Sequence, residues 1–584
     1  MTLTPYERLK ALVADLYGAE KASQIIAKLE EIIRRYQTAP SLNPSDMEWG
    51  SLTEADALLI TYGDQVMSPG EAPLATLHGF LKRYVGSALN GVHLLPFYPY
   101  SSDDGFAVID YRRVNPALGD WTHIHTLGQD YRLMFDGVIN HISRRSAWFE
   151  AFIRAEPPYR DYFVVSNPAE DYSQVVRPRT SPLLTNVETR RGSEYVWTTF
   201  SEDQIDLNYA NPQVLVEIVD LLLFYASQGA SLIRLDAIAY LWKEMGTSCL
   251  NLPQTHAVVK LLRAVLDIAA PQVLLMTETN IPHAENIAYF GDPLLGTTRT
   301  DEAQLVYQFP LAPLLLHTFR IGNCTLFQNW VSSLSTPASG AAFFNFTASH
   351  DGIGLQPAYG LLEPADLQAL VDQTLARGGQ VSYKTNLQGK HEVYELNITW
   401  YDAINDPRQP LLKLDLARFL ASQVIMLSLA GVPGIYFHSL LGSSSCHACF
   451  KELGHPRSLN RQKFTLAELE AQLQDPENRA YQALEAFKRL LTIRCRQPAF
   501  HPAAQQQVLD LGGSVFGLIR RPEGGGEPLL CLVNVTSRNQ SVPTDPQLLD
   551  LSPTGCLYDL ISKKPSLPGE LVLEPYQALW LAPG

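Results

Sequence analysis

Apolar runs of strand length alternate with longer helix-like stretches through most of the chain. Eight such runs occupy residues 58–64, 91–99, 132–141, 231–238, 273–279, 303–309, 341–351 and 431–438. Between them, stretches such as 214–229 and 256–270 repeat apolar residues at helical spacing. Each run is apolar on both faces, which is typical of parallel strands covered by helices. The pattern therefore predicts an α/β protein built on a (β/α)₈ TIM barrel.

The pattern departs from the barrel repeat in four places. Residues 1–50 mix charges with apolar residues at helical spacing, which predicts an N-terminal helical extension. The connections at 157–207 and 355–405 are too long for ordinary barrel loops, so we expect an inserted subdomain and a second inserted loop region. Short strands divided by turn residues predict a C-terminal all-β domain at 505–584. The barrel itself is then divided among residues 51–156, 208–354 and 406–504.

Charge and cysteine content narrow the class of protein. The formal net charge of −15 argues against a general nucleic-acid binder or a binder of anionic membranes. The first residues lack the apolar segment of a signal peptide, and we find no run long enough to span a membrane. Seven scattered cysteines favour reduced thiols and a cytoplasmic location. Cys446 and Cys449 form a C-x-x-C motif without a second pair, a weak signal for metal or redox use.

Polar residues gather where the predicted strands end. Arg234 and Asp236 lie two apart in one apolar run, so they share a face. Singly, such residues are explained as helix caps, buried ion pairs or hydrogen-bonded core residues. Together they predict a site at the barrel mouth, where barrel enzymes build their active sites. The group consists of Asp103, Asn140, His141, Arg234, Asp236, Glu278, His350 and Asp351.

A metal centre is the main alternative chemistry for these carboxylates and histidines. However, the chain lacks H-x-x-x-H and H-x-H patterns, and Arg234 would repel a cation. We therefore expect no metal and no organic cofactor.

Four segments of the chain resemble the ordered sequence regions of the α-amylase superfamily, glycoside hydrolase family 13. They read "DGVINH", "LIRLDAIAY", "LLMTET" and "FTASHD". The stretches "GTSC", "SHDGIG" and "GVPGIYFHSLLG" are similar to the sucrose-phosphorylase branch of that family. The resemblance covers roughly residues 55–465 and implies a retaining glycosyl-transferring enzyme that forms a covalent glucosyl intermediate.

The resemblance also implies roles for individual residues. Asp236 matches the nucleophile, Glu278 the general acid/base, and Asp351 the carboxylate that stabilises the transition state. The matches that would hold the glucosyl group or position the nucleophile are Asp103, Phe106, His141, Arg234, His350 and Arg461. Because a guanidinium favours a neighbouring carboxylate, we expect Arg234 to lower the pKa of Asp236. Glu278 needs a raised pKa, and a carboxylate separation near 5–5.5 Å would give retention by double displacement.

The acceptor side decides between a hydrolase and a phosphorylase. A phosphorylase must hold a phosphate dianion, which requires cationic donors. In "VVRPRTS", Arg179 matches the phosphate-binding arginine of sucrose phosphorylases, and Arg177 lies beside it. The chain departs from those enzymes at 278–280, where it reads ETN instead of EVH, and at 394–397, where it reads YELN instead of YQVN. The expected phosphate- or acceptor-binding residues are Arg177, Arg179, Asn280, Lys384, Tyr394 and Glu395, with Lys390 and His391 adding positive charge nearby.

Three further segments point to one subgroup of the branch. "TETNIPHAEN", "GGQVSYKTN" and "YELNITWYDA" resemble glucosylglycerate phosphorylases, which implies inorganic phosphate and an α-glucoside of glycerate as substrates. Sucrose, sucrose 6′-phosphate and glucosylglycerol remain open as alternative substrates, as do an α-glucosidase and a silent carbohydrate-binding protein. By analogy with the branch, a homodimer is also possible.

Overall fold

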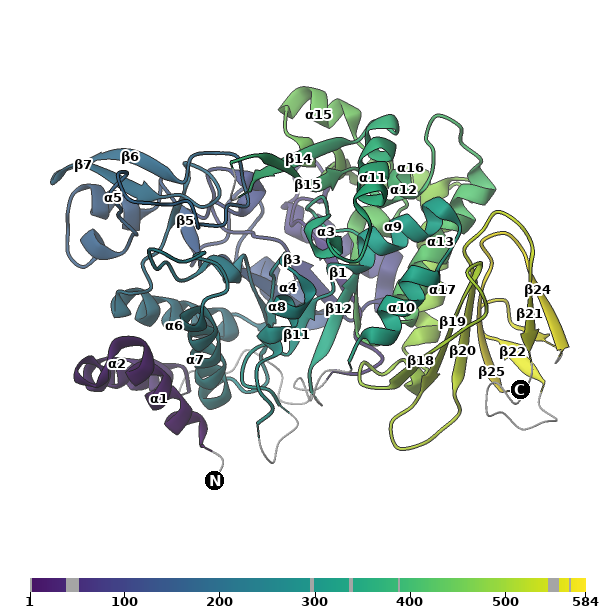
Figure 1. Cartoon of the computed structure of the whole chain (residues 1–584), viewed down its shortest axis with the longest axis horizontal. Helices are drawn as coiled ribbons and strands as arrows, with labels where there is room; N and C mark the ends of the chain where they lie inside the picture. Colours follow the sequence, from purple (N-terminus) through teal and green to yellow (C-terminus); the bar gives the residue numbers. More distant parts are fainter. Residues whose placement is uncertain are drawn as a thin grey trace.

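A computed structural model describes residues 3–37, 52–294, 299–335, 340–386, 389–544, 556–566 and 569–583 (Figure 1). Its centre is a closed barrel of eight parallel strands in the order β1-β16-β12-β11-β10-β9-β4-β3, as predicted. The strands are β1 (Leu58–Thr61), β3 (Gly91–Leu94), β4 (Arg132–Gly137), β9 (Ala230–Leu235), β10 (Leu274–Thr277), β11 (Leu305–Tyr307), β12 (Ala342–Phe346) and β16 (Val432–Tyr436). Each strand ends before its predicted apolar run does. The polar residues that follow leave the hydrogen-bonded ladder and lie at the barrel mouth.

Helices surround the barrel and cover its strands. The two helices predicted at 214–229 and 256–270 are present as α6 (Pro212–Ser227) and α7 (Pro253–Ala269). Both begin with proline, which suits the first turn of a helix because its missing N–H needs no partner there. The others of the barrel region are α3 (Pro73–Phe80), α4 (Trp121–Asp130), α5 (Ala147–Ile153), α8 (His283–Ile287), α9 (Leu311–Ile321), α10 (Thr325–Ser333), α13 (Leu412–Ser428), α14 (Phe437–Leu440), α16 (Leu466–Leu473) and α17 (Arg479–Arg494).

Two N-terminal helices pack on one side of the barrel. They are α1 (Pro5–Tyr17) and α2 (Ala19–Gln37), which lie beside α6 and α7 in Figure 1. The Arg8 guanidinium lies 2.6 Å from the Asp267 carboxylate of α7, and the Tyr17 hydroxyl donates to the Tyr209 carbonyl at 2.9 Å. The rest of the predicted extension, residues 38–50, lies outside the described residues.

Both long insertions contain regular structure of their own. The first holds the hairpin of β6 (Leu184–Thr189) and β7 (Gly192–Trp197) and ends in β8 (Gln204–Asp206), which pairs with β5 (His141–Ser143). The second holds α11 (Pro364–Ala376), β14 (Gln380–Thr385), β15 (His391–Asn397) and α12 (Trp400–Ile404). Strands β14 and β15 form a three-stranded sheet with β13 (Ile353–Gly354), which follows barrel strand β12. The second insertion is thereby tied to the barrel mouth.

The chain ends in β-structure, at the right of Figure 1. A six-stranded sheet has the order β18-β19-β20-β25-β22-β23, and β21 pairs with β24. These strands are β18 (Gln505–Leu509), β19 (Val515–Arg521), β20 (Leu529–Asn534), β21 (Gln540–Thr544), β22 (Leu557–Asp559), β23 (Lys564–Ser566), β24 (Gly569–Leu573) and β25 (Ala578–Pro583). The sheet is joined to α13 through Ser428, whose carbonyl accepts from Arg520 and whose hydroxyl accepts from Trp580, both at 2.8 Å.

One expectation about the cysteines was wrong. Cys446 and Cys449 form a disulfide instead of two reduced thiols. Cys446 is the N-cap of α15 (His447–Leu453), so the helical turn brings the two Cα atoms within 5.2 Å of each other. That separation suits a disulfide. Separately, none of the described helices is long and apolar enough to cross a membrane.

Candidate active site

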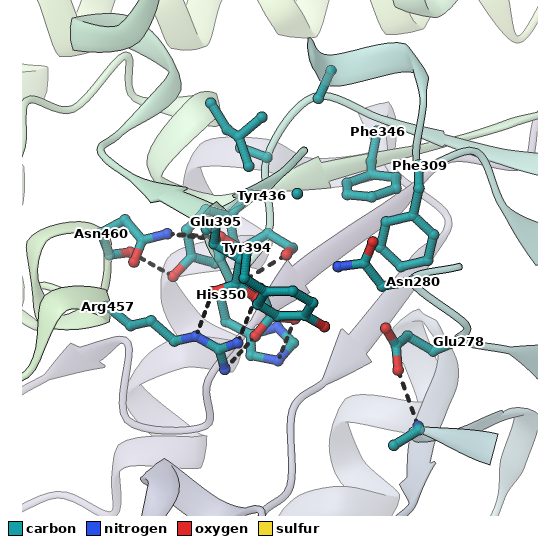
Figure 2. Close-up of a pocket in the computed structure, with 18 of the residues that line it drawn as sticks. Glu278, Asn280, Phe309, Phe346, His350, Tyr394, Glu395, Tyr436, Arg457 and Asn460 are labelled. Carbon is teal, nitrogen blue, oxygen red and sulfur yellow. Dashed lines mark hydrogen bonds and ion pairs between the residues drawn. The ribbon is translucent and has the colours of Figure 1, made fainter. Parts of the chain in front are cut away.

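A cavity at the carboxyl ends of the barrel strands brings most of the expected residues together (Figure 2). Its walls come from the segments after β3, β4, β9, β10, β11, β12 and β16 and from the two insertions. The expected residues that line it are Asp103, Phe106, His141, Arg179, Asp236, Glu278, Asn280, His350, Asp351, Tyr394 and Glu395. The three carboxyl groups that carry the expected chemistry therefore face one space.

Arg234 lies beneath this cavity and joins three carboxylates. Its Nη1 atom donates to Asp236 Oδ1 at 2.8 Å and also to Asp136, and its Nη2 atom lies 3.8 Å from Glu278 Oε2. Asp136 stands opposite Arg234 in the register of β4 and β9, and it is fully buried. His93 Nε2 lies 2.7 Å from the other oxygen of Asp136. The charged pair inside an apolar strand is thus part of a buried network under the site.

Asp136 was not predicted from the sequence as the partner of Arg234. Its signal was present, because Asp136 opens the segment "DGVINH". A strand pairing between residues 98 apart cannot be read from the chain alone.

Arg234 lowers the pKa of Asp236, as expected, but the net shift of that pKa is upward. Burial raises the pKa of Asp236, and although Arg234 lowers it, the nearby Asp136 and Asp351 carboxylates raise it further. The pKa of Asp236 therefore lies above its ordinary value. Desolvation and the two other carboxylates, which depend on the fold and not on the local sequence, outweigh the effect of the neighbouring guanidinium.

Glu278 has the raised pKa that the sequence analysis expected. Burial raises its pKa to about 7 against the effect of Arg234, and the Asp236 carboxylate acts in the same direction as burial. The Glu278 Oε2 atom accepts from the backbone N–H of Ala237 at 3.0 Å, the contact drawn as a dashed line in Figure 2. Ala237 has a left-handed backbone, with φ of 48°. Such strained residues often cluster at active sites, and this one fixes the carboxyl beside Asp236.

Asp351 has the opposite electrostatic environment. Burial raises its pKa, but Arg457, His350 and Arg461 outweigh that effect, so the pKa lies below its ordinary value. Arg457 Nη1 lies 2.6 Å from Asp351 Oδ1, and His350 Nε2 lies 3.4 Å from Oδ2. The site therefore pairs an ionised carboxylate, Asp351, with a carboxyl that can gain and lose a proton near neutral pH, Glu278.

Rings and amides form the wall next to Asp351. Phe106 stacks on His350 with ring centroids 4.8 Å apart, and His141 Nε2 donates to the Phe106 carbonyl at 3.0 Å. Gln204, which the sequence analysis missed, donates from Nε2 to Asp103 Oδ2 at 3.4 Å. It belongs to β8, where the first insertion returns to the barrel, so its nearness to Asp103 depends on that strand pairing with β5.

Arg461 and Arg234 lie behind the cavity wall and are not on it. Arg461 Nη1 lies 2.6 Å from Asp104 and 3.8 Å from Asp103, and its Nε donates to the His350 carbonyl at 2.8 Å. Arg461 therefore contacts residues of the wall, and any role in holding a sugar would act through Asp103 and His350.

Arg179 lines the cavity between two aromatic rings. Its guanidinium carbon is 5.4 Å from the centroid of Phe200 and 5.5 Å from that of Tyr394. Its Nη1 atom donates to the Pro178 carbonyl at 3.1 Å. Among the residues that the structure describes, no carboxylate pairs with Arg179, which leaves its charge available to an anion.

The other basic residues that were expected to bind phosphate or the acceptor do not line the cavity. Arg177 and Lys384 do not line the cavity, and Lys390 and His391 are exposed on the second insertion. Besides Arg179, Arg457 also faces the cavity, and it was not singled out from the sequence. It follows the helix α15, far along the chain from Asp351 and Glu395, and no local pattern marks it.

A buried lysine fixes the loops beside the site. Lys243 Nζ lies 2.5 Å from Asp206 Oδ2 and 2.9 Å from Asn140 Oδ1, and it also donates to the Tyr240 carbonyl. These oxygens come from the first insertion, from the loop after β4 and from the loop after β9. The ammonium group therefore holds together three segments that carry His141, Gln204 and Asp236.

Comparisons with known proteins agree with this fold. The α-amylase catalytic-domain family model matches residues 84–336. A glucosylglycerate phosphorylase of Allomeiothermus silvanus is 48% identical over 99% of both chains. One of Spirochaeta thermophila is 44% identical over 100% of this chain and 99% of its own. The crystal structure of a sucrose 6F-phosphate phosphorylase from Thermoanaerobacter thermosaccharolyticum superposes with a TM-score of 0.70 and 23% identity, over 82% of this chain and 94% of that one.

The structural match at 23% identity shows the fold, and the sequence matches show the family. Because they extend over nearly the whole length of both chains, the protein belongs to the glucosylglycerate phosphorylase family, a group of glycosyl-transferring enzymes with an α-amylase-type barrel.

Proposed function

We propose that this protein reversibly phosphorolyses 2-O-α-glucosylglycerate to α-glucose 1-phosphate and D-glycerate. The observation that carries the proposal is the composition of one cavity. The carboxyl groups of Asp236, Glu278 and Asp351 face the same space as Arg179, a cation without a carboxylate partner among the described residues. The pKa of Glu278 is raised to about 7, whereas the pKa of Asp351 is lowered. Family membership supports the choice of substrates.

In the proposed mechanism the first displacement removes glycerate. Protonated Glu278 gives its proton to the oxygen of the glycerate leaving group, and Asp236 attacks the anomeric carbon to form a glucosyl ester. The Asp351 carboxylate stabilises the positive charge that develops on the sugar ring. Burial of Glu278, which raises its pKa to about 7, favours the protonated form that this step requires.

The second displacement transfers the glucosyl group to phosphate. Glu278, now ionised, takes a proton from the phosphate as its oxygen attacks the anomeric carbon, and Asp236 leaves as a carboxylate. Two inversions give net retention of the α configuration. Arg179 is proposed to hold the phosphate, since a guanidinium forms paired hydrogen bonds with phosphate oxygens.

The reverse reaction provides the test. The enzyme is supplied with α-glucose 1-phosphate and, in separate assays, D-glycerate, fructose, fructose 6-phosphate or glycerol, and released phosphate is measured. Release that depends on D-glycerate is the expected result. Faster release with a sugar acceptor would overturn the substrate, and equal release without any acceptor would show that water accepts the glucosyl group.

The cytoplasmic location and the homodimer stay predictions.

A further inference from the structure

The disulfide between Cys446 and Cys449 has no part in the proposed chemistry. It closes a short turn at the start of α15, with the two cysteines three residues apart in the chain. His447 and Ala448, the two residues inside the turn, are exposed, and both cysteines are partly exposed. The disulfide therefore lies at the surface, where a dithiol in solution has the access that thiol–disulfide exchange requires.

Hydrogen bonds join this turn to two segments that line the cavity. The N–H of Cys446 donates to the Leu459 carbonyl at 2.8 Å. Leu459 belongs to a short 3₁₀ helix, η8 (Pro456–Asn460), which follows α15 in the chain. Ser445, the residue before the disulfide, accepts at Oγ from the N–H of Thr399 at 3.1 Å, and Thr399 lines the cavity. The position of the turn is therefore coupled to the positions of η8 and of the second insertion.

The helix η8 carries two side chains that hold Asp351. Arg457 Nη1 lies 2.6 Å from Asp351 Oδ1, and the Asn460 amide donates to the Asp351 carbonyl at 2.8 Å. Asn460 also donates to the Ser349 carbonyl at 3.2 Å, so it fixes the backbone on both sides of His350. Figure 2 shows Arg457 and Asn460 beside His350 on the cavity wall. A shift of η8 would therefore shift the carboxylate that is proposed to stabilise the transition state.

Reduction breaks the covalent link that holds the turn. A thiolate of an external dithiol attacks one sulfur of the disulfide, a mixed disulfide forms, and the other cysteine leaves as a thiolate. The second thiol of the reductant then attacks the reductant's own sulfur in the mixed disulfide and releases the remaining cysteine. In total two electrons and two protons pass to the cysteines, and the dithiol becomes a cyclic disulfide. The disulfide holds the two Cβ atoms about 3.5–4.5 Å apart, and reduction removes that restraint.

We propose that the Cys446–Cys449 pair is a site of reversible thiol–disulfide exchange with dithiols, which regulates the enzyme. The disulfide keeps η8 in the position from which Arg457 and Asn460 hold Asp351. The inference rests on the proposed function, because it concerns the regulation of the same site. The oxidised enzyme is the more active form. Since the Asp351 carboxylate acts in the transition state, reduction lowers kcat and leaves the KM for the substrates nearly unchanged.

The test places the enzyme in buffers that contain reduced and oxidised dithiothreitol at a series of ratios. Alkylation of free thiols, followed by mass spectrometry of peptides, measures the fraction of the pair that is oxidised. Phosphate release from α-glucose 1-phosphate with D-glycerate as acceptor is measured at each ratio. We expect kcat to fall about tenfold along the same titration curve, since a small misplacement near the reacting groups costs up to about 100-fold.

Three variants locate the effect. The double variant Cys446→Ser/Cys449→Ser should have the kcat of the reduced enzyme in every buffer. Cys495→Ser is the matched control, because Cys495 is a partly exposed free cysteine at the end of α17, and this variant should respond to dithiothreitol like the unaltered enzyme. In Arg457→Lys the grip on Asp351 is already weakened, so the ratio of kcat between the oxidised and reduced forms should fall.

Thermal unfolding is measured for every form alongside kcat. A kcat that stays constant while the pair passes from oxidised to reduced would overturn the inference, even with a lower Tm, because the disulfide would then be purely structural. So would a pair that dithiothreitol does not reduce in the folded enzyme, a redox response that persists in the double variant, or an undiminished response in Arg457→Lys. An absence of turnover with D-glycerate in every buffer would instead contradict the proposed function. Release of fluoride from α-glucosyl fluoride, which needs no glycerate, would then measure the redox response by itself.

Discussion

The Lys243 ammonium group forms an ion pair with Asp206 in which both partners are buried, at 2.5 Å and with only 5% of the lysine side chain exposed. Asp206 also accepts from the backbone and hydroxyl of Thr199, at 2.9 and 2.6 Å. Asn140, in the loop after β4, also donates to Asp206 at 3.2 Å, so this carboxylate has partners from the first insertion and from two barrel loops. The pair couples the insertion to the strand end that carries Asp236.

Replacing Lys243 by Met should destabilise the fold and reduce turnover. The substitution leaves the Asp206 carboxylate buried without its cation, which costs about 3–5 kcal/mol in comparable cases. Chemical denaturation with urea measures the loss. The control is Lys488→Met, because Lys488 pairs with Glu485 where both side chains are partly exposed, at 33% and 46%. That surface pair should contribute less than about 1 kcal/mol. Equal losses in the two variants would contradict the proposed role of Lys243.

The barrel and the site differ in how far the sequence could predict them. A strand that is apolar on both faces appears in the sequence as a continuous apolar run. For this reason the eight predicted runs match the eight barrel strands. Asp236 and Glu278 could be found because strand ends in a parallel barrel meet at one mouth. Arg457 could not, because it reaches Glu395 across 62 residues of chain through a loop whose course no local pattern fixes.

Lys384 is a residue for which the prediction from the sequence was wrong. It is near Tyr394 in the hairpin, so sequence proximity predicted a shared site, yet it does not line the cavity. The face of the sheet to which a side chain points depends on the register between β14 and β15. The bulge at Tyr394 shifts that register. The cations that face the acceptor side could therefore not be chosen by counting basic residues nearby.

The raised pKa of Glu278 should make the stability of the protein depend on pH. Its carboxyl has an ordinary pKa of 4.5 and a pKa of about 7 in the folded state, so the native state binds the proton more tightly. Stability from this group is full below pH 4.5 and is lost as the pH rises through 7. Glu278→Gln removes the cost of about 3 kcal/mol at high pH. The variant should therefore gain more stability over the unaltered protein at pH 8 than at pH 5, as measured by urea denaturation.

A pH-independent difference between the two proteins would contradict a raised pKa at Glu278. Glu485→Gln is a suitable control because that side chain is 46% exposed and does not line the cavity. Its substitution should give nearly the same small change in stability at both pH values.

Arg179→Ala should weaken phosphate binding selectively. A guanidinium that holds a dianion contributes hydrogen bonds to charged groups, so its loss should raise KM for phosphate about 10- to 100-fold. Hydrolysis of the glucosyl enzyme by water does not use this cation and should change less. Arg177→Ala is the matched control, since Arg177 is two residues away and does not line the cavity. Phosphorolysis rates at varied phosphate measure both variants, and an unchanged KM in Arg179→Ala would remove Arg179 from the site.

Glu278→Gln should trap the glucosyl group on Asp236. Turnover of the natural substrate should fall by several orders of magnitude, because neither displacement has its acid or base. With α-glucosyl fluoride, fluoride leaves without protonation, so the first displacement proceeds while the second lacks its base. Mass spectrometry of peptides should then locate one glucosyl group on Asp236. The double variant Glu278→Gln/Asp236→Asn should carry no label. A label on any other residue, or one that persists in the double variant, would show that Asp236 is not the nucleophile.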